Sequence, residues 1–446
     1  MSRASLLVVF VLVPNFIFGQ ATFSLNSSAA SHQQGPAQGG QTTLPGGAPS
    51  SPPPSKLITL DEAIDLAHAN SPTLQGTRTQ IQQSLAQEVT ADLRPNPTLG
   101  GDSQFIPFFS PGQFSQDVEQ FDIGVGYTFE RGGKRRKRLL AARDNTSVTR
   151  SQVADAERTL TFNVAQQFIN ALLANSNLSL AQEDLKSFQR TVDISEERYR
   201  AGDISEGDNL KIKLQLLQFQ TDVSSARVAK VQALGSLRQL IGYAALPRDF
   251  DVGGDLAYQP LKTRLEDLEA KAMSLRPDLR SAEQGINAAR SQLALAKANG
   301  VQDINLTTTY SHTPGLSSLS WFVSIPLPIF DRNQGEIARS QFAVTQSQYN
   351  QKAAQDTVMT DVTNAFEATE TNQEVVELYL SGYLKQAQDS RDISAYAYKG
   401  GAATLLDFLD AERSYRATQL AYRQALAAYM ISLEQLREAV GTRSLP

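Results

Sequence analysis

The chain of 446 residues contains the same unit twice in succession, and this duplication limits the folds that it can adopt. In each copy a leucine is followed twelve residues later by a proline, and several later motifs keep their order. The matched segments are 60–74 with 265–279, 129–131 with 330–332, 199–202 with 398–401, and 208–210 with 407–409. A period this long indicates duplication of a whole unit and excludes a short-repeat solenoid.

Each copy has the pattern of two helices, two strands, a long helix, a turn and a final helix. Thr59 with Glu62 three residues later predicts a capping box at the start of the first helix. The second helix is expected over residues 73–93, until Pro95 and Pro97 end it.

Two very long helices are expected. Residues 134–199 lack both Pro and Gly and predict a helix of roughly 100 Å, while residues 336–398 predict one of roughly 90 Å, with Gly382 as its weak point. In the helix expected over residues 134–199, apolar residues recur every four and then every seven positions. This spacing predicts a coiled-coil seam. The recurring residues are Leu160, Val164, Phe168, Leu172, Leu178, Leu185, Val192 and Tyr199. The shorter helices, 73–93 and 205–242, together have the length to flank one long helix.

The predicted strands alternate apolar residues with small or polar ones. Residues 121–129 do so most clearly, and the second copy has strand patterns at 305–310 and 320–325. Residues 108–114 and 311–319 carry Pro, Gly and Ser and are expected to be exposed loops.

The composition divides the chain into four parts. Residues 1–21 have the charged start, short apolar run and small-residue cleavage site of a signal peptide. Residues 22–56 are rich in Pro, Gly and Ser and predict a linker. The two copies then occupy residues 57–250 and 251–446.

Composition also excludes several functions. Acidic and basic residues nearly balance, at 46 against 41, which argues against nucleic acid as a partner. The chain has no cysteine and only three scattered histidines, so we expect no metal site. No catalytic or cofactor-binding motif is present, and we expect neither an enzyme nor a cofactor.

The strands set a condition on assembly. Four strands of about ten residues suit a membrane barrel wall, but known membrane barrels start at about eight strands. An open edge in lipid leaves unpaired backbone groups, so several chains must share one barrel. Three chains would supply twelve strands, with the helices continuing as a coiled-coil cylinder. The alternative is a soluble helical bundle with two small hairpins.

These features resemble the TolC-like family of outer-membrane efflux proteins over nearly all of residues 57–446. The most specific motif is the turn 198–210 with its counterpart 398–409, and residues 327–336 resemble the cobalt–zinc–cadmium branch. The resemblance implies a mainly α fold with a small β part, assembled as a homotrimer with a twelve-stranded barrel in the outer membrane over an α-helical periplasmic barrel.

The function implied by the resemblance is that of a passive exit duct. A periplasmic adaptor and an inner-membrane pump of the resistance-nodulation-division type would supply selection and energy for export of metal ions or small toxic compounds. Two alternatives stay open: a duct for type I secretion, and a periplasmic coiled-coil scaffold or adaptor without a pore.

Three groups of residues are candidates for function. The helix-turn-helix tips have glycines suited to a left-handed turn and residues suited to N-caps, and by resemblance they meet the adaptor. The tip residues are Gly202, Asp203, Ser205, Asp208, Gly401, Ala402 and Thr404.

The second group is Asp407 with Asp410, which lie three residues apart on one helix face. By resemblance they form acidic rings at the periplasmic aperture and favour cations. The alternative is a solvated face on which they pair with Arg413 or Arg416.

The third group is a basic run where the barrel is expected to meet the helices. Its members are Arg131, Lys134, Arg135, Arg136, Lys137 and Arg138. We expect these side chains to reach the phosphates of outer-membrane lipid.

Overall fold

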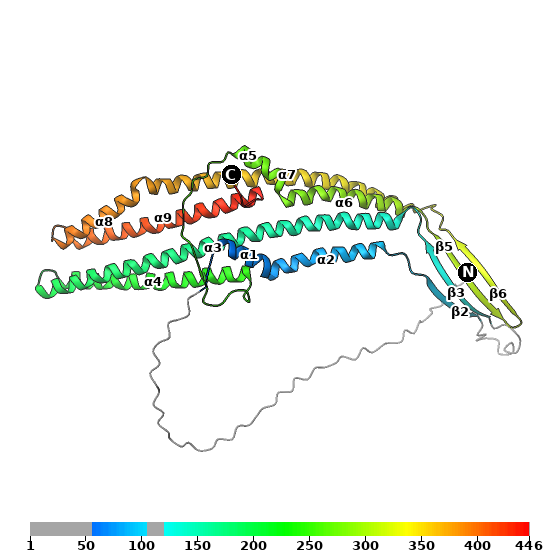
Figure 1. Cartoon of the computed structure of the whole chain (residues 1–446), viewed down its shortest axis with the longest axis horizontal. Coiled ribbons are helices and arrows are strands. Elements are labelled where there is room, and N and C mark those ends of the chain that lie inside the picture. The colour runs from blue at the N-terminus through cyan, green and yellow to red at the C-terminus, as the bar shows by residue number, and fades with distance from the viewer. Residues whose placement is uncertain (1–55, 105–119, 446) are drawn as a thin grey trace, which may run out of the picture. The chain divides into compact units, whose positions relative to one another are not determined.

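Both copies contain the expected elements in the same order (Figure 1). The computed structural model describes residues 56–104 and 120–445. The expected signal peptide, nearly all of the expected linker and the loop 108–114 lie outside the described residues. The division of the rest at residue 250 stays a prediction.

The elements of the first copy are β1 (Leu57–Ile58), α1 (Leu60–Asn70), α2 (Pro72–Asp92), β2 (Thr98–Gln104), β3 (Gln120–Phe129), α3 (Lys134–Ala201) and α4 (Glu206–Ile241). Those of the second are β4 (Asp251–Val252), α5 (Leu265–Leu275), α6 (Pro277–Asn299), β5 (Ile304–Thr313), β6 (Leu316–Ser324), α7 (Gln334–Leu378), the π-helical turn η2 (Tyr379–Tyr383), α8 (Leu384–Lys399) and α9 (Leu405–Val440). The expectation of a mainly helical chain with a small β part is confirmed.

Local sequence explains how several helices begin. Thr59 and Glu62 form the expected capping box at the start of α1, where each side chain bonds the other's backbone N–H. Pro72 and Pro277 occupy the first position of α2 and α6, where a missing N–H removes no intrahelical bond.

The two long helices differ in continuity. Helix α3 runs without a break over 68 residues. Its counterpart is interrupted at Gly382, where φ is +141° and a π-helical turn separates α7 from α8. Gly382 is therefore the weak point that the sequence predicted, because only glycine adopts this backbone conformation without strain.

The predicted seam of α3 is correct in its first half and only partly correct in its second. Leu160, Val164, Phe168 and Leu172 are buried as expected, and so is Val192. Leu178 and Leu185 are only half-buried and Tyr199 is exposed, whereas Leu180 and Phe188 are buried outside the predicted seam. From Leu180 to Val192 the buried positions step by four residues, and the expected seven-residue step does not apply.

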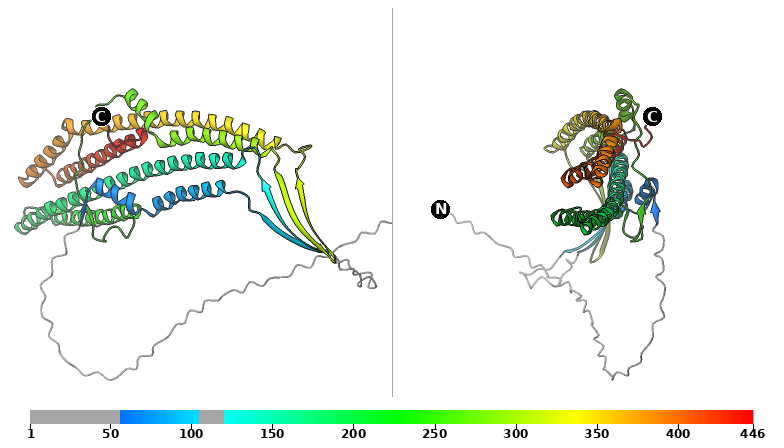
Figure 2. Two further views of the ribbon diagram at one scale, coloured as in Figure 1. Left: turned by 45° about the vertical axis from the view of Figure 1, so that its right-hand side comes forward. Right: turned by 90° about the vertical axis from the view of Figure 1, so that its left-hand side faces the viewer.

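Shorter helices follow one another along the long ones. Figure 1 shows α2 and α4 in succession along α3, and α6 and α9 in succession along α7 and α8, as their contacts also show. Helix α3 joins the copies by contacting α6 and α9 (Figure 2). The structure therefore confirms that two shorter helices flank each long one.

Each copy has its own hydrophobic cluster near the short first helix. The first cluster includes Ile64 of α1, Phe168 of α3 and Ile241 of α4. The second includes Leu268 of α5 and Val362 of α7 with residues of α9. Strands β1 and β4 pair in parallel and connect the beginning of the first copy to the beginning of the second.

The other strands form one antiparallel sheet in the order β2-β3-β5-β6. The expectation of a loop over 311–319 is wrong, because β5 continues to Thr313 and β6 begins at Leu316. Only Pro314 and Gly315 make the turn, and the φ of +86° at Gly315 suits glycine. Pro and Gly signalled a tight turn here, not a long loop.

The sheet has one apolar and one polar face. Ile123, Val125 and Trp321 on the apolar face are between 42% and 68% exposed in the single chain. On the polar face, a Cβ at Gly124 would lie 2.9 Å from Thr309 Oγ1, so a larger residue there would require the Thr309 side chain to move. No helix within residues 56–104 and 120–445 is both long and apolar enough to cross a bilayer.

Candidate functional site

The two helix-turn-helix tips have the geometry that their sequence predicts. Gly202 and Gly401 have φ values of +84° and +75°, in the left-handed region that favours glycine. Ser205 accepts a bond from the backbone N–H of Asp208 and so caps α4. Asp203 and Ala402 are exposed between the helices of their hairpins.

The second tip is closed by a full capping box. Thr404 Oγ1 accepts a bond from Asp407 N (3.2 Å), and the Asp407 carboxylate accepts bonds from Thr404 N (3.1 Å) and Oγ1 (2.7 Å). These bonds hold the pKa of Asp407 below its ordinary value. Its exposed carboxylate is therefore ionised at neutral pH.

Asp410 shares the exposed face but has a different partner. Its Oδ1 accepts a bond of 3.1 Å from Arg413. The pair is largely exposed, and a pair of this kind contributes little to stability. Both aspartates thus present carboxylates to solvent close to the second tip.

A contact that the sequence does not predict joins the two tips. Arg198 Nη1 donates a bond of 3.2 Å to Tyr398 O, and the guanidinium lies 5.4 Å from the Tyr398 ring centre. That ring stacks on Phe408, and burial raises the pKa of its hydroxyl. Both partners lie in the matched turns, but neither turn contains a signal that they meet.

A second unpredicted contact joins the hairpins further from the tips. Arg416 of α9 bonds Asp184 of α3 at 3.2 Å, contacts Asp222 of α4 and lies 4.2 Å from the Phe219 ring centre. Its neighbour Glu412 has a raised pKa because it is desolvated by burial. Arg416 therefore does not pair with Asp407 or Asp410.

The basic run closes the end of α2. Arg138 donates to Ala91 O (2.9 Å) and Leu93 O (2.8 Å), and Arg135 Nε donates to Asp92 O (2.5 Å). The positive charges of these side chains also interact favourably with the negative, C-terminal end of the α2 dipole. In the second copy the amide of Asn333 performs this role by donating to Ala296 O (2.7 Å) at the end of α6.

The same run links helices to strands through ion pairs. Lys134 bonds Asp303 (2.8 Å) at the start of β5, and Arg138 bonds Glu130 (2.7 Å) at the end of β3. Arg136 is exposed and Lys137 half-buried. The run therefore has an internal structural role that its sequence did not reveal.

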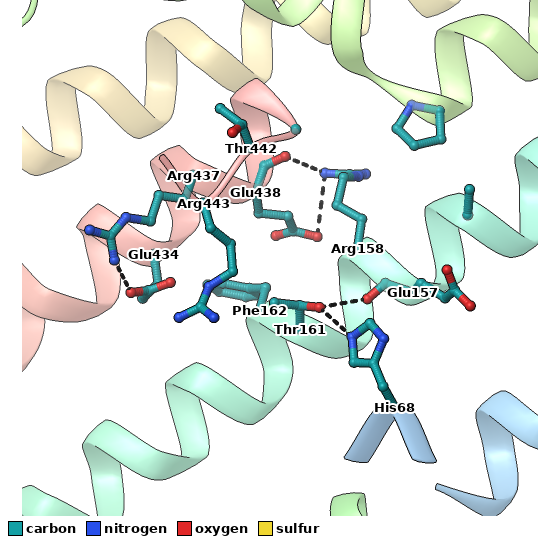
Figure 3. Close-up of a pocket in the computed structure, with 13 residues that line it drawn as sticks. His68, Glu157, Arg158, Thr161, Phe162, Glu434, Arg437, Glu438, Thr442 and Arg443 are labelled. Atoms are coloured by element: carbon teal, nitrogen blue, oxygen red, sulfur yellow. Dashed lines mark hydrogen bonds and ion pairs between the residues drawn. The ribbon is translucent and has the colours of Figure 1, made fainter. Parts of the chain in front are cut away.

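A cavity of about 260 Å³ lies between α1, α3 and α9 (Figure 3). His68 Nε2 lies 2.8 Å from Thr161 Oγ1, which itself donates to Glu157 O. Burial raises the pKa of Glu438, which lies 3.6 Å from Arg158, and Arg158 opposes this rise. Each charged side chain that lines the cavity is in an ion pair, either with another lining residue or with Arg78, Asp61 or Asp155 beside it. The cavity therefore lies at a contact between the two copies and offers no unpaired charge to a ligand.

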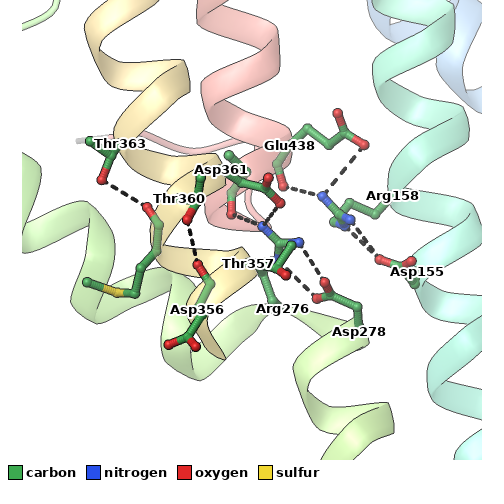
Figure 4. A network of polar contacts seen from close by, with 12 residues as sticks. Asp155, Arg158, Arg276, Asp278, Asp356, Thr357, Thr360, Asp361, Thr363 and Glu438 are labelled. Carbon is green, nitrogen blue, oxygen red and sulfur yellow. Dashed lines mark hydrogen bonds and ion pairs between the residues drawn. The ribbon is translucent and has the colours of Figure 1, made fainter. Parts of the chain in front are cut away.

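Arg276 is the centre of a neighbouring polar network (Figure 4). Its side chain is only 3% exposed, and its guanidinium bonds Asp278 (2.5 Å), Asp361 (2.8 Å) and Ala439 O (3.3 Å). Burial raises the pKa of Asp278, but the bonds and charge of Arg276 outweigh it, so the pKa is lowered. The first copy has Ser71 at the matching position, before Pro72.

Metal-binding geometry is absent from the part of the chain that the structure describes, where no three His, Asp or Glu side chains are grouped suitably. What the geometry offers is a membrane-type sheet, long helices and two exposed tips. This arrangement defines the class of protein: a channel-type transport protein.

Comparison with known proteins agrees with this class. The family model described as "Outer membrane efflux protein" matches residues 63–243 and 268–442. The cation efflux system protein CusC of Escherichia coli K12 is 25% identical over 370 residues, covering 80% of each chain. The cobalt-zinc-cadmium resistance protein CzcC of Cupriavidus metallidurans is 21% identical, covering 82% of this chain and 85% of the relative.

Solved structures share the fold. A structure of CusC has a TM-score of 0.72 at 22% identity and covers 87% of this chain and 94% of its own. The open state of the Neisseria gonorrhoeae MtrE outer membrane channel has a TM-score of 0.71 at 22% identity, covering 86% and 89%.

The chain belongs to the outer membrane efflux protein family. It is an efflux protein of the outer membrane with a long periplasmic helical part, and the resemblance seen in its sequence is confirmed.

Proposed function

We propose that three copies of this chain form the exit duct of a tripartite efflux system. The observation that supports this proposal most strongly is the four-stranded sheet. Its edge strands, β2 and β6, have no further partner strand among the described residues. Its exposed apolar face suits lipid, but open edges do not, and three sheets would close a twelve-stranded barrel. Mass measurement of the detergent-extracted protein tests this, and a monomer contradicts it.

The two tips are the proposed docking site for a periplasmic adaptor. Asp203 and Ala402 are exposed, and the Arg198–Tyr398 contact holds the two tips together as one surface. A photo-cross-linker at either exposed position should capture a co-expressed adaptor, whereas one at the exposed Phe342 of α7 should not. Capture only from Phe342 contradicts the proposal.

Asp407 and Asp410 are the proposed acidic rings of the periplasmic aperture. Three copies would form two stacked rings of three carboxylates each, which favour cations and bind polyvalent ones. Asp407→Asn combined with Asp410→Asn removes the charge, and the amide introduced by Asp407→Asn keeps a side-chain oxygen for the Thr404 cap. We expect weaker cation selectivity and weaker block by divalent ions in single-channel recordings; unchanged values contradict the rings.

Three members of the basic run are the proposed lipid contact. Arg131 and Arg136 are exposed and Lys137 is half-buried, and none of the three forms a side-chain ion pair within residues 56–104 and 120–445. These side chains are therefore the ones proposed to reach lipid phosphates. Charge reversal at Arg136 and Lys137 should impair membrane insertion, and unimpaired insertion contradicts this role.

The proposed cargo is metal ions or small toxic compounds, and the proposed pump is of the resistance-nodulation-division type. CusC is named for cation efflux and CzcC for cobalt, zinc and cadmium resistance, which supports metals over secreted polypeptides. Deletion of the protein should raise periplasmic metal in cells under metal stress. Loss of polypeptide secretion with unchanged metal would favour the type I duct.

A further inference from the structure

Another cavity, of about 440 Å³, lies where the helices of the first copy meet the sheet. Its walls come from the end of α2 and the chain that follows it, from the last residues of β3 and from the first turn of α3. Figure 1 shows these three segments converging at one end of the helices. Because the helices are periplasmic, this junction lies on the periplasmic side of the membrane that the sheet is proposed to cross.

Positive charge is in excess in the walls of this cavity. The lining contains two carboxylates and four cations, which are Asp92, Glu130, Arg94, Lys134, Arg135 and Arg136. Arg135 pairs with Asp92 at 3.0 Å, whereas Glu130 and Lys134 pair with residues outside the lining. Arg94 and Arg136 are exposed and have no ion pair within residues 56–104 and 120–445. The cavity therefore has two guanidinium groups available to an anion.

Another part of the lining is apolar. Tyr127 and Phe129 of β3 pack edge to face, with ring centres 4.8 Å apart, and Leu139 of α3 also lines the cavity. Residues two apart on a strand share a face, so both rings belong to the face that carries Ile123 and Val125. Ile123, Val125 and Phe129 are all exposed. The apolar part of the cavity thus continues into the surface that is proposed to lie against lipid.

A ligand that satisfies both parts of the cavity has an anionic head and an apolar tail. Guanidinium groups form forked hydrogen bonds with phosphate oxygens. Aromatic rings collect at the level of the lipid headgroups in membrane barrels, because they accept an apolar chain on one side and a polar group on the other. A free inorganic anion would use only the cationic part, whereas a phospholipid of net negative charge uses both.

The second copy lacks the residues that make this site. Residues 129–131 match residues 330–332, so the segment 134–136, which is Lys-Arg-Arg, matches the segment 335–337, which is Gly-Glu-Ile. Glu336 in that segment pairs with Arg339. The second junction therefore offers a carboxylate where the first offers a guanidinium, and the duplication alone does not account for the cationic cavity.

We infer that this cavity binds the headgroup of an anionic phospholipid of the periplasmic leaflet. Arg94 and Arg136 hold the phosphate, and the acyl chains follow the apolar face of β3 past Tyr127 and Phe129. This inference rests on the proposed insertion of the sheet into the membrane. It turns the general lipid contact of the basic run into a defined site and adds Arg94, which lies outside that run.

Native mass spectrometry of the detergent-extracted full chain tests this inference, with phosphatidylglycerol as the added lipid. The wild type should bind one phosphatidylglycerol per chain more tightly than any further molecule. Arg94→Gln with Arg136→Gln should weaken this first binding by about tenfold or more, because charge-assisted bonds to the phosphate are lost. Arg131→Gln with Lys137→Gln is the matched control, since it removes the same charge from the basic run outside the cavity lining and should leave the tight binding unchanged.

Two further probes identify the ligand. Diacylglycerol, which has the acyl chains but no phosphate, should not occupy the tight site, and excess inorganic phosphate should not displace phosphatidylglycerol from it. Displacement by inorganic phosphate would show a site for the free anion and overturn the lipid as ligand. Arg94→Lys with Arg136→Lys keeps the charge and should bind more tightly than the glutamine variant, which gives a second comparison should that variant fold poorly.

The remaining outcomes separate this site from the proposed function. Equal weakening in the glutamine variant and in the matched control would show attraction by net charge alone, which overturns the site but leaves the lipid contact of the basic run standing. A trimer by mass that binds no phosphatidylglycerol tightly overturns the site and leaves the proposed channel standing. A monomer that binds no lipid overturns both.

Discussion

Replacing Arg416 with methionine should weaken the joint between the two helical hairpins, more at neutral pH than in acid. The guanidinium lies 3.2 Å from Asp184, contacts Asp222 and covers the Phe219 ring. Methionine retains much of the apolar length but removes the charge, so the loss is mainly electrostatic.

Asp184 determines the magnitude. Its side chain is 10% exposed, whereas that of Asp222 is 29% exposed and can recruit water. Removing one partner of a buried pair costs about 3–5 kcal/mol. The cost has an upper limit, because the Asp184 carboxyl of the variant can take up a proton instead of staying charged. Protonating a carboxyl of ordinary pKa 3.8 at pH 7 takes about 4 kcal/mol, at 1.36 kcal/mol per pH unit. We therefore expect a loss of about 3–4 kcal/mol in the free energy of unfolding at pH 7.

The pH dependence has a definite sign. Burial raises the pKa of Asp184, and the charge of Arg416 partly offsets this rise. Without Arg416, the pKa of Asp184 rises further. The folded variant then binds more protons than its unfolded chain, so its stability rises as pH falls towards the unfolded pKa. Between pH 7 and pH 5 the loss relative to wild type should shrink by about 2 kcal/mol.

Guanidinium unfolding in detergent, followed by far-UV circular dichroism at both pH values, measures this effect. Arg416→Met with Asp184→Asn is the matched control, since it removes the stranded carboxylate and should restore about half of the loss at pH 7 without added pH dependence. A loss below about 1 kcal/mol, or one independent of pH, would refute the reasoning.

Three further predictions concern the caps, the helix break and the Arg276 network. Thr404→Ala should cost about 1 kcal/mol and speed hydrogen exchange in the first turn of α9, while Thr404→Ser should not; equal exchange in both would count against the cap. Gly382→Ala should cost about 1–3 kcal/mol in thermal unfolding because of its φ of +141°, whereas Gly285→Ala, in a regular open stretch of α6, should be neutral or stabilising; equal effects would contradict the strain. Asp278 has a lowered pKa, so its contribution to the free energy of unfolding is present above its unfolded pKa and is lost as pH falls through the lower folded pKa. Acid titration of the stability of Asp278→Asn should lack this loss, and a curve identical to that of the wild type would be inconsistent with the argument.

Local sequence signals predicted most of the fold. The capping box at Thr59 and Glu62, the prolines that begin α2 and α6, and the Gly/Pro-free run of α3 each act through their own backbone, so they predict correctly without knowledge of neighbours. The alternation at 121–129 likewise predicted β3. Gly382 was correctly marked as a weak point because its conformational freedom is intrinsic.

The remaining features depend on which distant segments meet. Arg416 faces Asp184 and Asp222, which are far from it in sequence, and no local pattern pairs them. The basic run looks like a surface patch in sequence, but Arg135 and Arg138 fold back onto the end of α2. The loop expected at 311–319 is a hairpin because strand pairing overrode the local Pro and Ser content. The aperture and tip residues have the expected local geometry, and their roles between chains stay predictions.

The most direct test of the whole account is the conductance of the detergent-extracted protein in planar bilayers, with its mass measured in the same detergent. The account predicts a trimer that forms small, cation-selective channels blocked by divalent or trivalent cations. A water-soluble monomer without channel activity would contradict it.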